Sequence, residues 1–160
     1  MTAHENLVLE LKDGKKVVIA LRPDLAPKAV ERLTTLAKEG FYDGVPFHRV
    51  IDGFMAQGGD PTGTGMGGSK LPDLPAEFSK TEKFERGTLG MARAQNPNSA
   101  NSQFFIMFDK CPSLDGQYTI AGKVVEGMDA VDGIKRGKGM SGMVEGPDKI
   151  VKAYVEPAAA

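Results

Sequence analysis

The sequence contains no tryptophan and a single cysteine among its 160 residues. One cysteine excludes an intrachain disulfide, and because no histidine lies near Cys111 in sequence we interpret it as a structural thiol. Apolar runs such as 17–21 and 104–108 are far shorter than the roughly 20 residues of a transmembrane helix. The N-terminus lacks the basic and apolar regions of a secretory signal. We therefore expect a cytoplasmic protein without membrane contacts.

An excess of charge of one sign is also missing. The sequence has 20 Lys and Arg and 21 Asp and Glu residues, which give a net charge of −1. This balance provides no electrostatic footprint for binding nucleic acid. The hydrophobic fraction of 41% is ordinary for a globular protein, and 160 residues fit a single domain over 1–160. The 20 glycines indicate many turns and a β-rich chain. We expect a monomer.

Several catalytic signatures are absent or lack their context. The pattern G-x-G-x-x-G occurs at 63–68 and 137–142, but neither copy has both the preceding strand and the following helix of a nucleotide-binding loop. We interpret both copies as flexible surface loops. The sequence has no P-loop, no G-x-S-x-G and no cluster with the spacing of metal ligands. It therefore predicts neither a cofactor nor a metal site.

The hydrophobic pattern predicts many short strands and two helices. Strands are expected over 7–11, 17–21, 47–51, 54–56, 88–92, 103–108, 118–125 and 150–155. One helix is expected to begin near Pro27 and end before Gly40, and a short one over 128–135. This order favours an antiparallel barrel or a sandwich, between which periodicity alone does not decide, with the helices covering its openings.

The segment 45–59 is the most informative part of the chain. Its two apolar runs flank Asp52-Gly53, which is typical of a tight hairpin. The guanidinium of Arg49 lies among aromatic and thioether side chains, where it needs solvent or a bound acceptor. This pattern indicates binding and polarisation of a substrate. His48 has the ordinary pKa of a general base, but we favour a structural role in which it is hydrogen-bonded within the barrel.

Five motifs in the same order resemble the cyclophilin family of peptidyl-prolyl cis/trans isomerases. They are FHRVI (47–51), FMAQGGD (54–60), GTLGMA (87–92), SQFFI (102–106) and LDG (114–116) with AGKV (121–124). The resemblance spans about 7–155. It implies a closed eight-stranded antiparallel barrel capped by two helices, with an active groove on the outer face.

The resemblance also implies the site residues. Arg49 matches the catalytic arginine, which donates to the prolyl nitrogen, and Gln57 matches the polar substrate contact. The apolar proline pocket would consist of Phe54, Met55, Phe105 and Leu114. The remaining substrate contacts would be His48, Ala92, Arg93, Gln103 and Tyr118.

Three positions depart from the pattern of many family members. Ser113 stands where many have tryptophan, a residue that helps to hold cyclosporin, so we expect weak cyclosporin binding. Tyr118 replaces a common histidine and Arg93 a common asparagine. These changes alter the edges of the groove, so we expect isomerase activity to survive with a shifted sequence preference.

The expected partners are proline-containing peptides and unfolded or partly folded proteins. Two hypotheses follow. The favoured one is an isomerase that accelerates rotation about X-Pro bonds during folding. The alternative is a non-catalytic proline-peptide-binding or chaperone module on the same fold.

Overall fold

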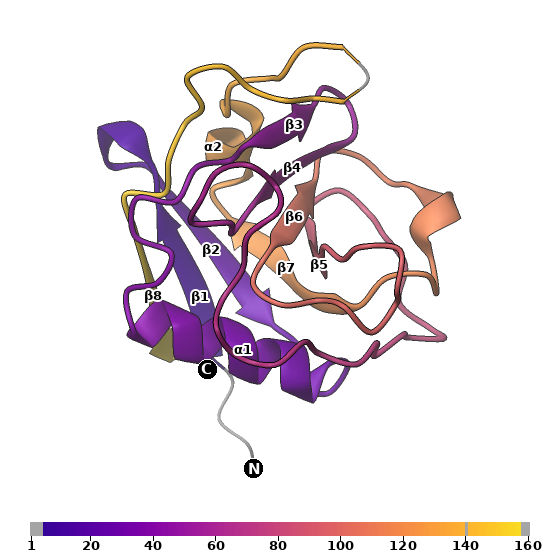
Figure 1. The fold of residues 1–160 in the computed structure, drawn as a ribbon. Coiled ribbons are helices and arrows are strands. Elements are labelled where there is room, and N and C mark those ends of the chain that lie inside the picture. The colour runs from indigo at the N-terminus through magenta and orange to yellow at the C-terminus, as the bar shows by residue number, and fades with distance from the viewer. Residues whose placement is uncertain (1–4, 140, 158–160) are drawn as a thin grey trace.

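The computed structural model describes residues 5–139 and 141–157, which form eight strands, two α-helices and two 3-10 helices (Figure 1). The strands are β1 (Glu5–Glu10), β2 (Lys16–Leu21), β3 (Arg49–Ile51), β4 (Met55–Gly58), β5 (Thr88–Met91), β6 (Phe104–Met107), β7 (Ile120–Glu126) and β8 (Lys152–Pro157). The helices are α1 (Pro27–Lys38), α2 (Met128–Asp132), η1 (Lys12–Gly14) and η2 (Pro112–Leu114). The eight expected strands and both expected α-helices are thus present, whereas neither 3-10 helix was predicted.

The strands form one antiparallel sheet in the order β3-β4-β6-β5-β7-β2-β1-β8. Its two end strands do not pair with each other within the described residues, and an isolated bridge between Pro46 and Lys149 lies between them. Proline has no N–H to donate at this bridge, and β3 begins three residues later, at Arg49. The expected eight antiparallel strands and two helices are confirmed, but the expected full closure of the barrel is overstated.

The edge of β3 is covered by Gly137 and residues 141–144. Val50 donates its N–H to the carbonyl of Gly142 at 2.8 Å, and Val144 donates to the carbonyl of His48 at 3.0 Å. Gly142 has φ +72°, and a Cβ there would lie 2.5 Å from the Ile51 side chain, so glycine is required for this close approach. Arg49 therefore lies on an edge strand whose outer side is held by a C-terminal loop.

Helix α1 crosses one end of the sheet and contacts β8 and β1 (Figure 1). Pro27 occupies its first turn, as expected, and Leu33 and Leu36 are buried on the face toward the core. Glu77 caps the helix from a distant loop, since its carboxylate accepts the N–H groups of Lys28 and Ala29 at 3.2 and 2.9 Å. In the described part of the chain, no helix combines the length and apolarity needed to cross a membrane.

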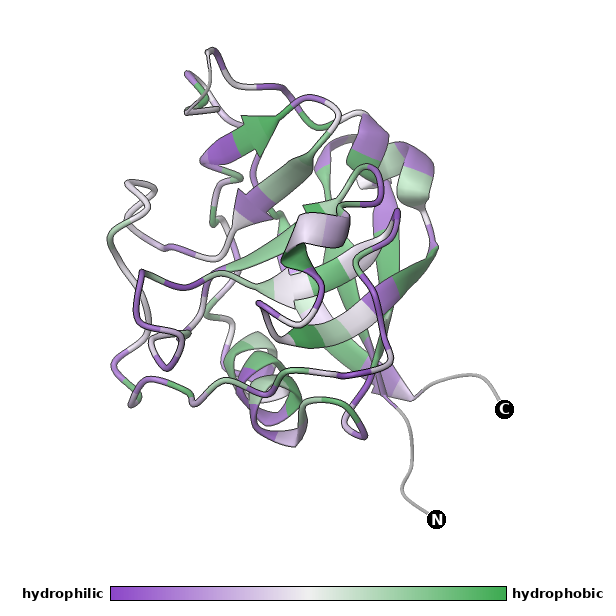
Figure 2. Cartoon of the chain, turned by 90° about the vertical axis from the view of Figure 1, so that its right-hand side faces the viewer, coloured by the Kyte–Doolittle hydropathy of each residue, from purple (hydrophilic) through white to green (hydrophobic). Residues whose placement is uncertain are grey.

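Neighbouring residues of the central strands contribute to two separate hydrophobic clusters. On β6, Phe104 and Ile106 belong to the main core, while Phe105 and Met107 belong to a second cluster on the other face. Figure 2 shows hydrophobic residues concentrated in the central strands and hydrophilic ones along the surrounding loops. The period of two in a strand therefore divides the sheet into a core face and a face that carries the second cluster.

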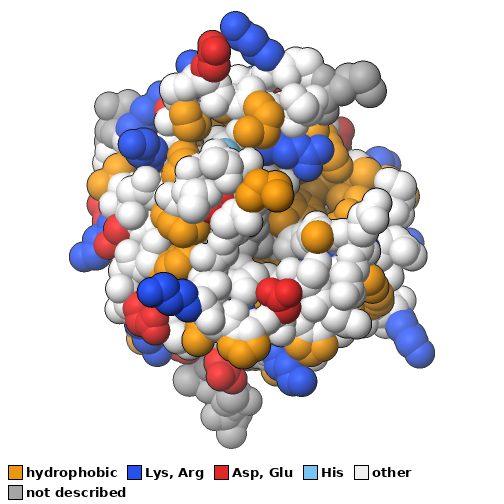
Figure 3. Space-filling model, in the orientation of Figure 1, with side chains coloured by type: hydrophobic (Ala, Val, Ile, Leu, Met, Phe, Trp, Pro, Cys, Tyr) orange, Lys and Arg blue, Asp and Glu red, His pale blue; other side chains and the backbone are white. Residues whose placement is uncertain are grey.

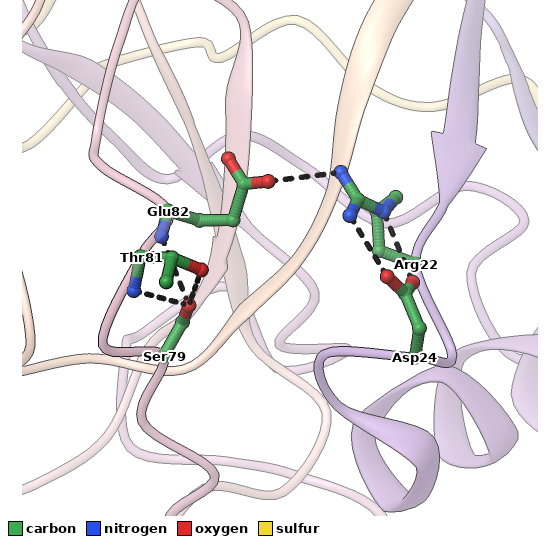
Figure 4. Close-up of polar contacts among 5 residues, drawn as sticks. All are labelled: Arg22, Asp24, Ser79, Thr81 and Glu82. Carbon is green, nitrogen blue, oxygen red and sulfur yellow. Dashed lines mark hydrogen bonds and ion pairs between the residues drawn. The ribbon is translucent and has the colours of Figure 1, made fainter.

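The long connection between β4 and β5 is tied to the end of β2 by a polar network (Figure 4). Arg22 forms an ion pair with Asp24 at 2.8 Å and another with Glu82 at 3.3 Å. Ser79 accepts the N–H of Glu82 at 3.0 Å, which turns the chain at this point. These contacts fix the segment that leads to Phe84, a fully buried member of the second cluster.

Candidate active site

A cavity of about 190 Å³ opens on the second cluster, between the β3–β4 hairpin and η2. Its lining is Arg49, Phe54, Met55, Gln57, Ala92, Arg93, Phe105, Leu114 and Tyr118. All nine are among the eleven residues predicted from the sequence. Figure 3 shows a hollow on this face, lined by hydrophobic side chains with a basic side chain at its rim. We call it the apolar cavity.

A second cavity of about 310 Å³ adjoins the apolar cavity, and we call it the glycine-loop cavity. It is lined by Gln57, Gly65, Met66, Gly67, Gly68, Asp73, Ala92, Arg93, Ala94, Ser99, Asn101 and Gln103. Gln57, Ala92 and Arg93 line both cavities and so form the boundary between them. The two cavities together make one continuous groove.

The floor of the apolar cavity is an aromatic stack. Phe105 stacks on Phe84 at 5.7 Å between ring centroids and meets the edge of Tyr118 at 5.8 Å. A Cβ at Gly90 would lie 2.6 Å from the Phe105 ring and 2.8 Å from the Phe84 ring. Glycine in strand β5 therefore makes room for the stack. Neither Phe84 nor Gly90 was among the site residues predicted from the sequence, although glycine inside a strand pattern signals such a close approach.

Arg49 stands at the rim of this cavity because β3 pairs it with Gln57 of β4. Its Nη1 donates to Gln57 Oε1 at 3.3 Å, and its Nε donates to the carbonyl of Ser141 at 2.8 Å. No carboxylate pairs with it among the described side chains. The guanidinium is thus oriented by neutral acceptors, and its charge is left for a ligand.

A chain of hydrogen bonds continues from Arg49 away from the apolar cavity. Gln57 Nε2 donates to Gln103 Oε1 at 2.9 Å, and Gln103 Nε2 donates to the carbonyls of Gly65 and Gly67, each at 2.9 Å. Gln103 therefore lies behind Gln57 and lines the glycine-loop cavity. Its amide links the β3–β4 hairpin to the glycine-rich loop.

Asp60 holds that loop and was not singled out from the sequence. Its fully buried carboxylate accepts the N–H groups of Thr62, Gly65 and Gly67 at 2.8, 2.6 and 3.1 Å. A Cβ at Gly67 would lie 2.2 Å from the carboxylate, so the loop needs glycine there. The first G-x-G-x-x-G copy is a surface loop, as expected, and its backbone is wrapped around a buried acid. The pattern Asp-Pro-Thr, typical of a side-chain-capped turn, was the available signal.

The pKa of Asp60 reflects two opposing effects. Burial by itself would raise the pKa of the carboxyl. The hydrogen bonds from Thr62, Gly67 and Gly65 outweigh it and lower the pKa from 3.8 to about 2. Asp60 is consequently ionised at neutral pH, and its charge stabilises the folded loop.

His48 does not line either cavity. Its side chain is 2% exposed and lies beneath Gly65, where an added Cβ would come within 3.4 Å of Nε2. Neither ring nitrogen has a hydrogen-bond partner among the described residues, so the expectation of a hydrogen-bonded His48 is wrong. Burial of the ring is the main cause that lowers the pKa of His48. The negative charge of Asp60 opposes this shift, and the positive charge of Arg49 adds to it. His48 thus packs as a neutral ring under the loop, and the structure does not bring it to the groove with the other predicted substrate contacts.

Arg93 is held over the ring of Tyr118, with its guanidinium carbon 4.3 Å from the ring centroid. Its Nη1 donates to the carbonyls of Ala94 and Gln95 at 3.0 and 3.3 Å, and its Nη2 donates to the carbonyl of Gln117 at 2.9 Å. These contacts join two loops on one side of the groove.

Comparisons with known proteins agree with this geometry. The family model "Cyclophilin type peptidyl-prolyl cis-trans isomerase/CLD" matches residues 7–155. A probable peptidyl-prolyl cis-trans isomerase of Brucella suis is 60% identical over 162 residues, which cover 94% of this chain and 82% of the relative. A peptidyl-prolyl cis-trans isomerase of Schizosaccharomyces pombe is 43% identical over 156 residues, which cover 92% of this chain and 97% of the relative.

Solved structures show the same fold. The crystal structure of a cyclophilin-type isomerase of Cryptosporidium parvum in the presence of the dipeptide Ala-Pro has a TM-score of 0.84 and 31% identity. The match covers 94% of this chain and 98% of that one. A cyclophilin of Hirschia baltica matches with a TM-score of 0.81 and 28% identity, covering 92% of this chain and 72% of that one.

The curled eight-stranded sheet, the two helices and the groove beside Arg49 define a protein of the cyclophilin type. The chain belongs to the cyclophilin family of peptidyl-prolyl cis/trans isomerases, and it is an enzyme of that class.

Proposed function

We propose that this enzyme accelerates rotation about X-Pro bonds of unfolded or partly folded proteins, with the proline ring in the apolar cavity and Arg49 as donor to the prolyl nitrogen. The observation that carries the proposal is the convergence of an apolar pocket and an unpaired guanidinium in one cavity. The Ala-Pro dipeptide named for the Cryptosporidium parvum structure supports a proline-containing ligand.

The chemistry requires few reactive groups. An X-Pro bond isomerises slowly because rotation breaks amide resonance. In the planar amide the nitrogen lone pair is delocalised toward oxygen, whereas in the twisted transition state the lone pair is localised and accepts a hydrogen bond. Arg49 therefore binds the prolyl nitrogen more strongly in the transition state than in the ground state, which is the condition for raising the rate.

The apolar cavity contributes by holding the ring. Phe54, Met55, Phe105 and Leu114 supply the apolar contacts for a proline side chain, and Phe105 is fixed from below by Phe84. Gln57 is oriented by both Arg49 and Gln103, so its amide is suited to contact the substrate backbone next to the proline. With the ring fixed, rotation takes place in the part of the chain that precedes the proline.

The alternative is a module that binds proline peptides in the same cavity without accelerating isomerisation. Arg49 favours the enzymatic hypothesis. The nitrogen of a planar amide is a poor hydrogen-bond acceptor, so a site that only binds the ground state would gain nothing from a donor there. The two proposals share the pocket and differ in the role of this donor.

A protease-coupled assay with succinyl-Ala-Xaa-Pro-Phe peptides tests the proposal. We expect Arg49→Ala to lower kcat by about two orders of magnitude, the effect typical of a lost transition-state donor, while the Kd for a proline peptide changes far less. Arg86→Ala is the matched control, because Arg86 pairs with Asp132 outside the groove. Full activity of Arg49→Ala would overturn the donor role, and peptide binding without turnover by the natural protein would establish the binding module.

A further inference from the structure

We propose that Arg93 determines substrate preference by favouring proline peptides that carry a carboxylate on a residue adjoining the proline. The proposal rests on the function proposed above, since it assumes that the proline occupies the apolar cavity. It concerns the chemistry of the neighbouring residue, which that function leaves open.

The position of Arg93 is the first observation. It lines both cavities, together with Gln57 and Ala92. A peptide with its proline in the apolar cavity and its chain continuing into the glycine-loop cavity has to cross this boundary. The side chain of the adjoining residue then passes the guanidinium of Arg93.

The charge of the groove is the second observation. Arg49 and Arg93 both line the apolar cavity, and its lining includes no aspartate or glutamate. Arg22, Arg86 and Arg136 each form an ion pair with a carboxylate, whereas neither groove arginine does so among the described side chains. The apolar cavity is therefore a site of uncompensated positive charge that attracts a carboxylate.

The glycine-loop cavity limits where that carboxylate lies. Asp73 lines this cavity and accepts a hydrogen bond from Asn101 Nδ2 at 3.1 Å. Its negative charge disfavours an acidic residue deeper in the cavity. The favoured place is thus at the boundary, beside Arg93.

The third observation is that the guanidinium is preorganised. The Tyr118 ring and three backbone carbonyls fix it in place, so binding a carboxylate costs little of the side-chain entropy that weakens most surface ion pairs. A guanidinium has five N–H donors. The buried Nε of Arg93 has no partner in the described part of the chain, and Nη2 uses one of its two hydrogens. Since that Nε is buried, the donor available to the substrate is the second hydrogen of Nη2, together with the full charge.

The test compares peptides with Glu, Gln or Lys next to the proline. One series varies the residue before the proline and another the residue after it, and kcat/KM is measured at low ionic strength. For the natural protein we expect about a threefold preference for Glu over Gln in the series whose variable residue faces Arg93, the scale of a partly exposed ion pair. Added salt should reduce this ratio by screening.

Three variants isolate the charge. Arg93→Gln should bring the Glu-to-Gln ratio to about one, Arg93→Lys should retain most of it, and Arg86→Gln, which makes the same charge change outside the groove, should leave it unaltered. Thermal unfolding of each variant checks that the loops remain folded. The proposal is overturned if the natural protein shows no Glu preference in either series, or if Arg93→Gln preserves the preference.

Calorimetric binding of the same peptides separates this proposal from the proposed function. If the Gln peptides bind but are not turned over, the isomerase proposal fails, while the Glu preference in Kd and its loss in Arg93→Gln still decide the role of Arg93. If they are turned over and the ratios do not respond to Arg93, only the specificity proposal fails.

Discussion

Replacing Asp60 by asparagine should cost stability by an amount that follows from its pKa. The native environment lowers that pKa from 3.8 to about 2. Because each pKa unit corresponds to about 1.4 kcal/mol, the charged form stabilises the fold by about 2 kcal/mol at neutral pH. In Asp60→Asn an NH₂ group would replace one of the two carboxylate oxygens that accept the loop N–H groups. We therefore expect the free energy of unfolding at pH 7 to fall by about 2 kcal/mol or more.

The pH dependence has a defined sign. A carboxyl whose folded-state pKa is lowered stabilises the protein above its unfolded pKa, and this stabilisation is lost as pH falls through the folded pKa. Urea unfolding should therefore show a large difference between the natural protein and Asp60→Asn at pH 7, which narrows between pH 3.8 and about 2. Equal stability of the two proteins at pH 7, or a difference that does not narrow in acid, would refute this account of Asp60.

The same variant tests the hydrogen-bond chain from Asp60 to Arg49. Releasing Gly65 and Gly67 removes the acceptors that orient Gln103, and through it Gln57. We expect a several-fold loss of kcat with a smaller change in Kd. Glu77→Gln is the matched control. The Glu77 carboxylate also accepts two backbone N–H groups, but it takes no part in the series of hydrogen bonds from Asp60 to Arg49. A similar loss of kcat in Glu77→Gln would mean that destabilisation alone explains the effect.

Three further predictions address the groove and the buried histidine. Phe105→Ala should reduce peptide affinity and turnover at least tenfold and destabilise the protein by about 3 kcal/mol, with a folded circular dichroism spectrum; normal activity would mean that the pocket is misplaced. Ser113→Trp should strengthen cyclosporin inhibition with nearly unchanged turnover, because Ser113 is exposed beside Leu114 and an indole adds apolar contact; tight inhibition of the natural protein would contradict this. Because burial lowers the pKa of His48, the unfolded chain takes up its proton first and stability should fall as pH drops below 6.5. His48→Gln should lack that part of the dependence in unfolding experiments, and an identical pH profile would disprove it.

Local signals explain how much of the fold was readable from the sequence. The turn at Asp52-Gly53, the proline at the start of α1 and the apolar run of β6 each act over a few residues, and all three elements formed as predicted. Closure of the sheet depends instead on contacts between distant segments. The short β3 and the loop that covers it could not be inferred from the hydrophobic pattern.

The site divides in the same way. Seven of the nine lining residues lie within the co-linear motifs, and Arg93 and Tyr118 lie within two residues of one, because those motifs carry both the strands and the side chains of the groove. Phe84, Gly90 and Asp60 were not predicted, because in a single sequence they cannot be distinguished from ordinary core, strand and loop residues. His48 shows the opposite error, since its neighbour Arg49 faces the groove while the next side chain on an extended segment faces away.

The division of β6 between two hydrophobic clusters has a consequence for how this enzyme tolerates change. Phe104 and Ile106 pack in the main core, while Phe105 lines the groove and Met107 packs in the second cluster, so substitutions at alternate positions act on separate clusters. A change on the substrate face therefore leaves the packing of the main core in place, although it still costs the packing energy of the second cluster. The same arrangement makes pairing errors severe, because a slip of one residue would exchange the two sets and damage folding and activity together.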